Sequence, residues 1–99
     1  MTADFNSIIN SGKPVLVDFY TEWCESCRTQ VPILEEIAHY LGDRIKVIKI
    51  DIDKNRLVAL KYGIGHLPTL MLFRNGKLKW QQAGLTPRSG LIEAIFNYS

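Results

Sequence analysis

The chain has 99 residues, of which 46% are hydrophobic and 22% are charged, and its formal net charge is +2. A chain of this length fills one hydrophobic core, so we expect residues 1–99 to form a single domain. The small net charge argues against nucleic-acid binding, and the lack of an apolar run of about 18 residues argues against a membrane span.

The first half of the chain predicts a strand, helix, strand unit. Residues 3–11 carry apolar side chains at helical spacing and predict a short amphipathic helix. Residues 15–20 form an almost unbroken apolar run, which predicts a central strand covered on both faces. Residues 24–41 predict a long helix that Pro32 should bend, and residues 45–51 predict a second strand parallel to the first.

The second half predicts a short helix, a hairpin and a closing helix. Residues 54–61 carry apolar side chains at helical spacing. Residues 69–73 and 77–81 are β-favouring and flank an Asn-Gly turn, which predicts two antiparallel strands. Thr86 is expected to be the N-cap of the last helix and Pro87 its first residue. The pattern predicts an α/β fold in which a parallel βαβ unit is joined to an antiparallel ββα unit.

Cys24 and Cys27 are the two cysteines of the chain, too few and too close together to be a stabilising scaffold. Cys24 is expected at the start of the long helix, where free N–H groups and the helix dipole favour a thiolate. It is therefore the predicted nucleophile. Cys27 lies one turn later on the same side, within reach of a disulfide, and is the predicted resolving thiol.

The cysteine pair has two other interpretations. Both residues could be small buried hydrophobes, but their place directly after a strand of a βαβ unit favours redox chemistry. A zinc site needs about four ligands, and His39 and His66 lie far apart without a paired-ligand spacing. No metal is predicted, and the alternative metal site would be one that bridges two chains.

Several short sequences resemble the thioredoxin family, in the family's order and spacing. They extend from about residue 13 to the C-terminus and comprise Val17–Tyr20, Trp23–Cys27, Pro32–Leu34, Lys61–Ile64, Leu67–Thr69 and Phe73–Gly76. The resemblance implies the thioredoxin fold and a thiol–disulfide oxidoreductase that reduces protein disulfides. It also implies that the redox-active disulfide Cys24–Cys27 serves without a bound cofactor.

The resemblance assigns substrate binding to four residues. Pro68 should follow a cis peptide bond and face the dithiol, while Leu67 and Thr69 hydrogen-bond an extended substrate segment. Without the family match, an ordinary turn proline would be favoured. Trp23 should lie beside the dithiol, although a core or rim tryptophan explains it equally well. His66 should lie near the groove that binds the substrate. The better interpretation of His66 is nevertheless a surface histidine without a function.

Asp18 and Lys49 are the predicted proton-transfer pair. Asp18 stands in the apolar central strand, where burial should raise the pKa of its carboxyl group toward the range of a general base. The family match implies that it exchanges a proton with Cys27 and that Lys49 pairs with it. From the residues alone, a partly exposed strand aspartate would be the more common case.

The chain departs from the family at two places. Glu25 and Ser26 stand where ordinary thioredoxins carry Gly-Pro, so both should influence the reduction potential of the Cys24–Cys27 pair. The backbone N–H of Ser26 favours the Cys24 thiolate and the charge of Glu25 opposes it, which leaves the redox poise open. The second departure is at the start of the chain, where the extra strand of full thioredoxins is expected to be missing. The resemblance then implies a sheet of four strands, in the spatial order 45–51, 15–20, 69–74 and 77–83.

Because the sequence does not fix the reduction potential of the Cys24–Cys27 pair, two alternative functions are retained. One is a thiol oxidase or disulfide isomerase with a more oxidising couple, and the other is a binding module that uses the groove around Trp23 and Pro68 without turnover. For the favoured reductase, the expected partners are disulfide-containing proteins and a reductase such as NADPH-dependent thioredoxin reductase. We expect a cytoplasmic monomer that serves electron transport and cell redox homeostasis, since no targeting segment is evident.

Overall fold

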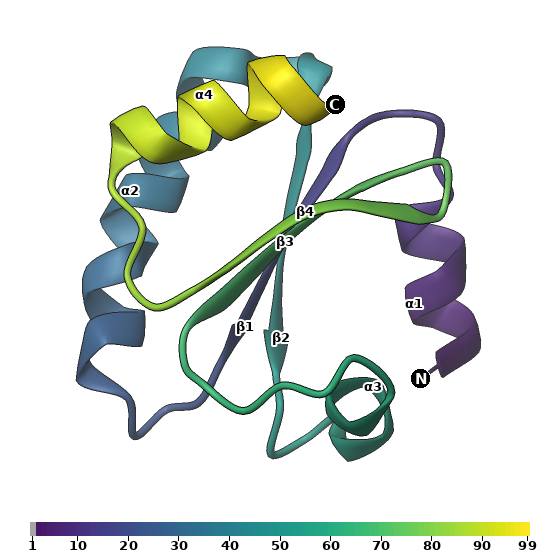
Figure 1. The fold of residues 1–99 in the computed structure, drawn as a ribbon, viewed down its shortest axis with the longest axis vertical. Helices are drawn as coiled ribbons and strands as arrows, with labels where there is room; N and C mark the ends of the chain where they lie inside the picture. Colours follow the sequence, from purple (N-terminus) through teal and green to yellow (C-terminus); the bar gives the residue numbers. More distant parts are fainter. Residues whose placement is uncertain (1) are drawn as a thin grey trace.

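The computed structural model describes residues 2–99, and its centre is one mixed sheet of four strands (Figure 1). The strands are β1 (Val15–Tyr20), β2 (Lys46–Asp51), β3 (Thr69–Arg74) and β4 (Lys77–Ala83). Their order is β2-β1-β3-β4, with β1 and β2 parallel and the two other pairings antiparallel. The predicted sheet order is confirmed.

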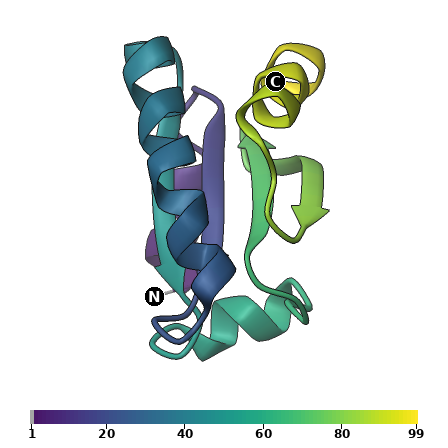
Figure 2. The ribbon, with the colours of Figure 1, turned by 90° about the vertical axis from the view of Figure 1, so that its left-hand side faces the viewer.

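Helices cover both faces of the sheet. They are α1 (Thr2–Ile9), α2 (Glu25–Leu41), α3 (Arg56–Lys61) and α4 (Arg88–Tyr98), and a 3₁₀ turn, η1 (Gly42–Arg44), follows α2. Figure 2 looks onto the face where α2 and α4 lie side by side, and Figure 1 shows α1 and α3 on the other side. The helix and strand order matches the sequence prediction, with ends displaced by a few residues.

Strand β1 is buried on both faces because its alternate side chains enter two separate apolar clusters. Val15, Val17 and Phe19 lie in the cluster beneath α1 and α3, and Leu16 lies in the cluster beneath α2 and α4. Successive side chains of a strand point to opposite faces. Asp18 therefore shares the face of Leu16, which is the face that α2 covers.

The beginning of α4 differs from the prediction. The prediction of Thr86 as N-cap and Pro87 as first helical residue is wrong, since Pro87 is the extended N-cap residue (φ −70°, ψ 162°) and the helix starts at Arg88. Gln30, buried in α2, holds Thr86 instead: its amide donates to Thr86 O and accepts from Thr86 N, both at 2.9 Å. The Thr86 hydroxyl donates to Gly84 O at 3.2 Å and so caps nothing.

Helix α2 continues through Pro32 from Glu25 to Leu41 without a break. Proline lacks the N–H that would bind the carbonyl four residues earlier, so it is tolerated best close to a helix start. Pro32 is the eighth of the 17 residues of α2, so one backbone hydrogen bond is missing from the interior of the helix, and the bend there stays a prediction. The helix carries Cys27 on its buried side.

Candidate functional site

Cys24 and Cys27 are joined by a disulfide at the N-terminus of α2, with their Cα atoms 5.2 Å apart. Cys24 is the N-cap residue, and its Sγ accepts a hydrogen bond from the Cys27 N–H at 3.1 Å. Cys24 is half-buried, whereas Cys27 is only 2% exposed. An incoming group can therefore reach the sulfur of Cys24, and the sulfur of Cys27 is shielded by the fold.

The helix start favours a negative charge on Cys24. The first N–H groups of a helix lack intrahelical partners, and the helix dipole places partial positive charge there. In the disulfide form one of these N–H groups already points at Cys24 Sγ. After reduction the same geometry stabilises a thiolate, which is the nucleophilic form of the thiol.

Ser26 links the dithiol to a distant loop through its side chain. Its Oγ lies 3.4 Å from Cys24 Sγ and donates to the carbonyl oxygen of Leu67, also at 3.4 Å. The sequence indicated a role only for the backbone N–H of Ser26. The hydroxyl contact joins residues that are 41 positions apart, so no local pattern could have revealed it.

The loop that Ser26 contacts contains a cis peptide bond between Leu67 and Pro68, as the resemblance implied. Pro68 is buried, and its carbonyl accepts the N–H of Gly84 at 2.7 Å. Thr69 begins β3 and its hydroxyl donates to His66 O at 2.6 Å. Gly84, with φ 89°, was missed by the sequence analysis, although a glycine directly after a strand is a signal for such a conformation.

Trp23 and Glu25 flank Cys24 on the surface. The Trp23 side chain is 87% exposed, so the interpretation as a core tryptophan is wrong and a place at the rim of the dithiol remains. Glu25 is exposed in the first turn of α2. Both side chains are therefore open to an approaching molecule.

Asp18 is fully buried, and neither of its carboxylate oxygens has a hydrogen-bond partner. Burial raises the pKa of this carboxyl group to about 6, an effect that the positive charge of Lys49 partly offsets. An acid with this pKa exchanges protons readily near neutral pH. The expectation from the sequence that Asp18 is buried is confirmed.

The predicted direct pair between Asp18 and Lys49 does not form. The two residues are register partners on β1 and β2, but Lys49 Nζ lies over the ring of Tyr20, 4.8 Å from its centroid. A cation is attracted to the face of an aromatic ring, and this position also keeps the ammonium group near solvent. Lys49 therefore acts on Asp18 through its charge alone.

Comparisons with known proteins give a consistent result. The family model "Thioredoxin" matches residues 1–97. A thioredoxin of Rickettsia bellii is 48% identical over 90 residues, which are 91% of this chain and 86% of the relative. Thioredoxin Y2, chloroplastic, of Arabidopsis thaliana is 50% identical over 89% of this chain and 53% of its own length.

The chain belongs to the thioredoxin family. The solved structure of Fasciola hepatica thioredoxin superimposes with a TM-score of 0.90 at 30% identity and covers 99% of this chain and 94% of its own. Plasmodium falciparum thioredoxin gives a TM-score of 0.87 at 33% identity, covering 98% and 93%. The protein is thus an enzyme, a thiol–disulfide oxidoreductase with the disulfide Cys24–Cys27 as its redox-active group, whose partners are disulfide-containing proteins and a reductase.

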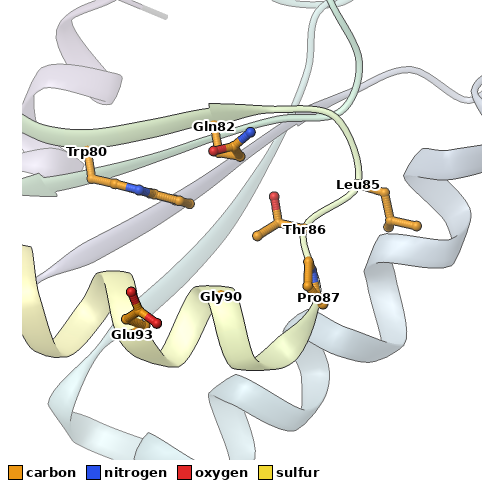
Figure 3. Close-up of a pocket in the computed structure, with 7 residues that line it drawn as sticks. All are labelled: Trp80, Gln82, Leu85, Thr86, Pro87, Gly90 and Glu93. Carbon is orange, nitrogen blue, oxygen red and sulfur yellow. The ribbon is translucent and has the colours of Figure 1, made fainter.

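Two of the hollows on the surface of the protein lie beside the dithiol and beside the last helix. One, of about 210 Å³, is lined by Cys27, Lys49, Tyr20 and Arg28 among others and reaches the dithiol from the β2 side. The other lies between β4 and α4 and is lined by Trp80, Gln82, Leu85, Thr86, Pro87, Gly90 and Glu93 (Figure 3). Its lining contains neither cysteine nor histidine and has a single carboxylate, that of Glu93.

Two further features bear on the predicted absence of metal and membrane. Within residues 2–99, no group of three or more His, Cys, Asp or Glu side chains is placed to hold a metal ion. None of the helices described for this part of the chain combines the length and apolar content of a membrane span.

Proposed function

We propose that this thioredoxin works as a reductase of protein disulfides, with Cys24 as the attacking thiol and Cys27 as the resolving thiol. The observation that carries the assignment is the unequal position of the two sulfurs. Cys24 is half-buried at the N-cap of α2, and Cys27 is buried one turn further along the helix. Only the first sulfur can meet the sulfur of a large substrate.

The reaction proceeds by two exchanges. The Cys24 thiolate attacks one sulfur of the substrate disulfide, a mixed disulfide forms, and the other substrate sulfur leaves as a thiolate that takes up a proton. Cys27 then loses its proton and attacks Cys24 Sγ, which releases the second substrate thiol. Two electrons pass to the substrate, and the protein is left with the Cys24–Cys27 disulfide.

Asp18 is proposed to accept the proton of Cys27 in the second exchange. Its carboxylate lies on the sheet face that α2 covers, has no hydrogen-bond partner, and has a pKa raised to about 6 by burial. A base with a pKa close to the working pH is effective in proton transfer. Lys49 limits the rise of this pKa through its charge.

The groove for the substrate is proposed to lie over Trp23, Leu67, Pro68 and Thr69. Trp23 is exposed beside Cys24, and the loop with Leu67 and Pro68 touches the active-site turn through Ser26. An extended segment here would pair its backbone with Leu67 and Thr69. Glu25 and Ser26 are proposed to set the redox potential of the couple.

The cellular setting is part of the same proposal. Residues 1–99 act as a single domain and as a monomer, and an NADPH-dependent thioredoxin reductase returns the Cys24–Cys27 disulfide to the dithiol. The protein works in the cytoplasm, where it carries electrons to disulfides and supports redox homeostasis. Two of the relatives are themselves named chloroplastic.

Turnover of a disulfide protein separates catalysis from binding. The purified protein is mixed with a disulfide protein in about a hundredfold excess and with excess reductant. We expect each protein molecule to reduce many substrate disulfides. The matched control contains reductant alone. Reduction of no more than one substrate disulfide per protein molecule would contradict the reductase and favour a binding module.

A further inference from the structure

Ser26 is the one residue of the active-site turn whose side chain reaches both the dithiol and the loop of the cis peptide bond. Its Oγ is 3.4 Å from Cys24 Sγ and 3.4 Å from Leu67 O. Ser26 is half-buried, so water competes with these contacts less than on the open surface. The hydroxyl is therefore placed between two acceptors.

The two acceptors compete for a single proton. A serine hydroxyl has one O–H to donate, and a backbone carbonyl can only accept. In the disulfide form Cys24 Sγ is a neutral and weak acceptor, so the hydroxyl proton belongs to Leu67 O. The structure shows this state, with the Leu67 carbonyl occupied by a donor from its own protein.

Reduction reverses the ranking of the acceptors. When two electrons cleave the disulfide and Cys27 takes up one proton, Cys24 is left as a thiolate. Hydrogen bonds to a charged group are roughly twice as strong as bonds between neutral groups. The hydroxyl then turns to Cys24 Sγ, which is already within reach, and leaves the Leu67 carbonyl without its donor.

We infer that the Ser26 hydroxyl is a redox-dependent positioning group that frees the Leu67 carbonyl in the reduced protein and occupies it in the oxidised protein. The inference rests on the proposed binding of an extended substrate segment by Leu67. The reduced enzyme thus offers a backbone acceptor when substrate must bind. Once the Cys24–Cys27 disulfide has formed, Ser26 takes that acceptor back, which favours release of the product.

The test compares three variants. Ser26→Ala removes the hydroxyl, Ser26→Thr keeps it, and Thr29→Ala removes an exposed hydroxyl of the same helix that binds Glu25 O and touches neither sulfur. The first readout is the Cys24 pKa from the ultraviolet absorbance of the thiolate. The second is the carbon chemical shift of the Leu67 carbonyl in the oxidised and reduced protein.

For Ser26→Ala we expect the acid dissociation constant of Cys24 to fall about tenfold, because a charge-assisted hydrogen bond is lost. The Leu67 carbonyl shift should respond to reduction in the wild type, Ser26→Thr and Thr29→Ala, and should lose that response in Ser26→Ala. The loss of both effects together supports the inference.

An unchanged Cys24 pKa in Ser26→Ala would overturn the inference, and so would a Leu67 response that persists without the hydroxyl. In either case the variant would still form a reversible disulfide and turn over substrate, so the proposed reductase would stand. Failure of the wild type itself to form a reversible disulfide would contradict both proposals.

Discussion

Cys27→Ser is expected to stop the reaction at the mixed disulfide and to reduce turnover by at least about a thousandfold, since the covalent intermediate cannot be resolved. Cys24 remains half-buried at the helix start and keeps its access to substrate. The serine is isosteric with the thiol, and the buried site needs no repacking. The adduct should accumulate with a disulfide protein and disappear on addition of a small dithiol, as measured by intact-mass spectrometry.

Cys24→Ser is the matched control for this trap. It leaves Cys27 as the single thiol, and Cys27 is only 2% exposed. We therefore expect no adduct and no turnover from this variant. An adduct that forms through Cys27 as fast as through Cys24 would contradict the assigned order of attack.

Asp18→Asn is expected to remove a large pH dependence of the stability of the oxidised protein. Burial raises the pKa of the Asp18 carboxyl from 3.8 to about 6. The folded protein therefore holds this proton to higher pH than the unfolded chain, and the free energy of unfolding falls as the pH rises between these values. A shift of about two units corresponds to about 3 kcal/mol, which is lost in full above the folded-state pKa.

The measurement is denaturant unfolding of the disulfide form at pH 4 and pH 8, which keeps cysteine ionisation out of the comparison. Relative to the wild type, Asp18→Asn should gain about 2 kcal/mol between the two pH values, since its side chain is neutral at both and the unfolded carboxyl of the wild type is already partly ionised at pH 4. Asp43→Asn, in the exposed turn η1, is the matched control and should follow the wild type. Equal slopes for Asp18→Asn and the wild type would exclude a carboxyl group with a raised pKa at this site.

The same variant tests proton transfer. Without the Asp18 carboxylate, the attack of Cys27 on the mixed disulfide should slow and should lose the rise in rate that accompanies ionisation near pH 6. The rate of release of the second substrate thiol measures this step. A resolution rate that matches the wild type at every pH would show that Cys27 loses its proton by another route.

Much of the fold follows from patterns that are local in sequence. The unbroken apolar run of β1 predicts a strand buried on both faces, and the Asn-Gly turn predicts the hairpin of β3 and β4, both of which the structure contains. The end of β1 and the beginning of the apolar stripe of α2 are enough to predict that Cys24 lies at the start of the helix. These signals depend on neighbours within a few residues, so they can be seen without coordinates.

The features that the sequence could not supply are contacts between distant segments. Gln30 resembles a surface residue of a helix, yet it is buried because Thr86, 56 positions away, completes both of its hydrogen bonds. That contact also explains why Thr86 does not cap α4. The position of the Lys49 side chain also depends on a contact between separate strands. The register of β1 and β2 places Asp18 and Tyr20 within reach of Lys49, and its ammonium group lies over the ring of Tyr20.

The most direct test of the central claim is the equilibrium of the Cys24–Cys27 couple with glutathione buffers of defined ratio. We expect a single reversible transition between disulfide and dithiol, with a reduction potential near the cytosolic glutathione poise or below it, as a general reductase requires. A much more oxidising potential would contradict the reductase in favour of an oxidase or isomerase. The absence of any reversible disulfide would contradict the redox function itself.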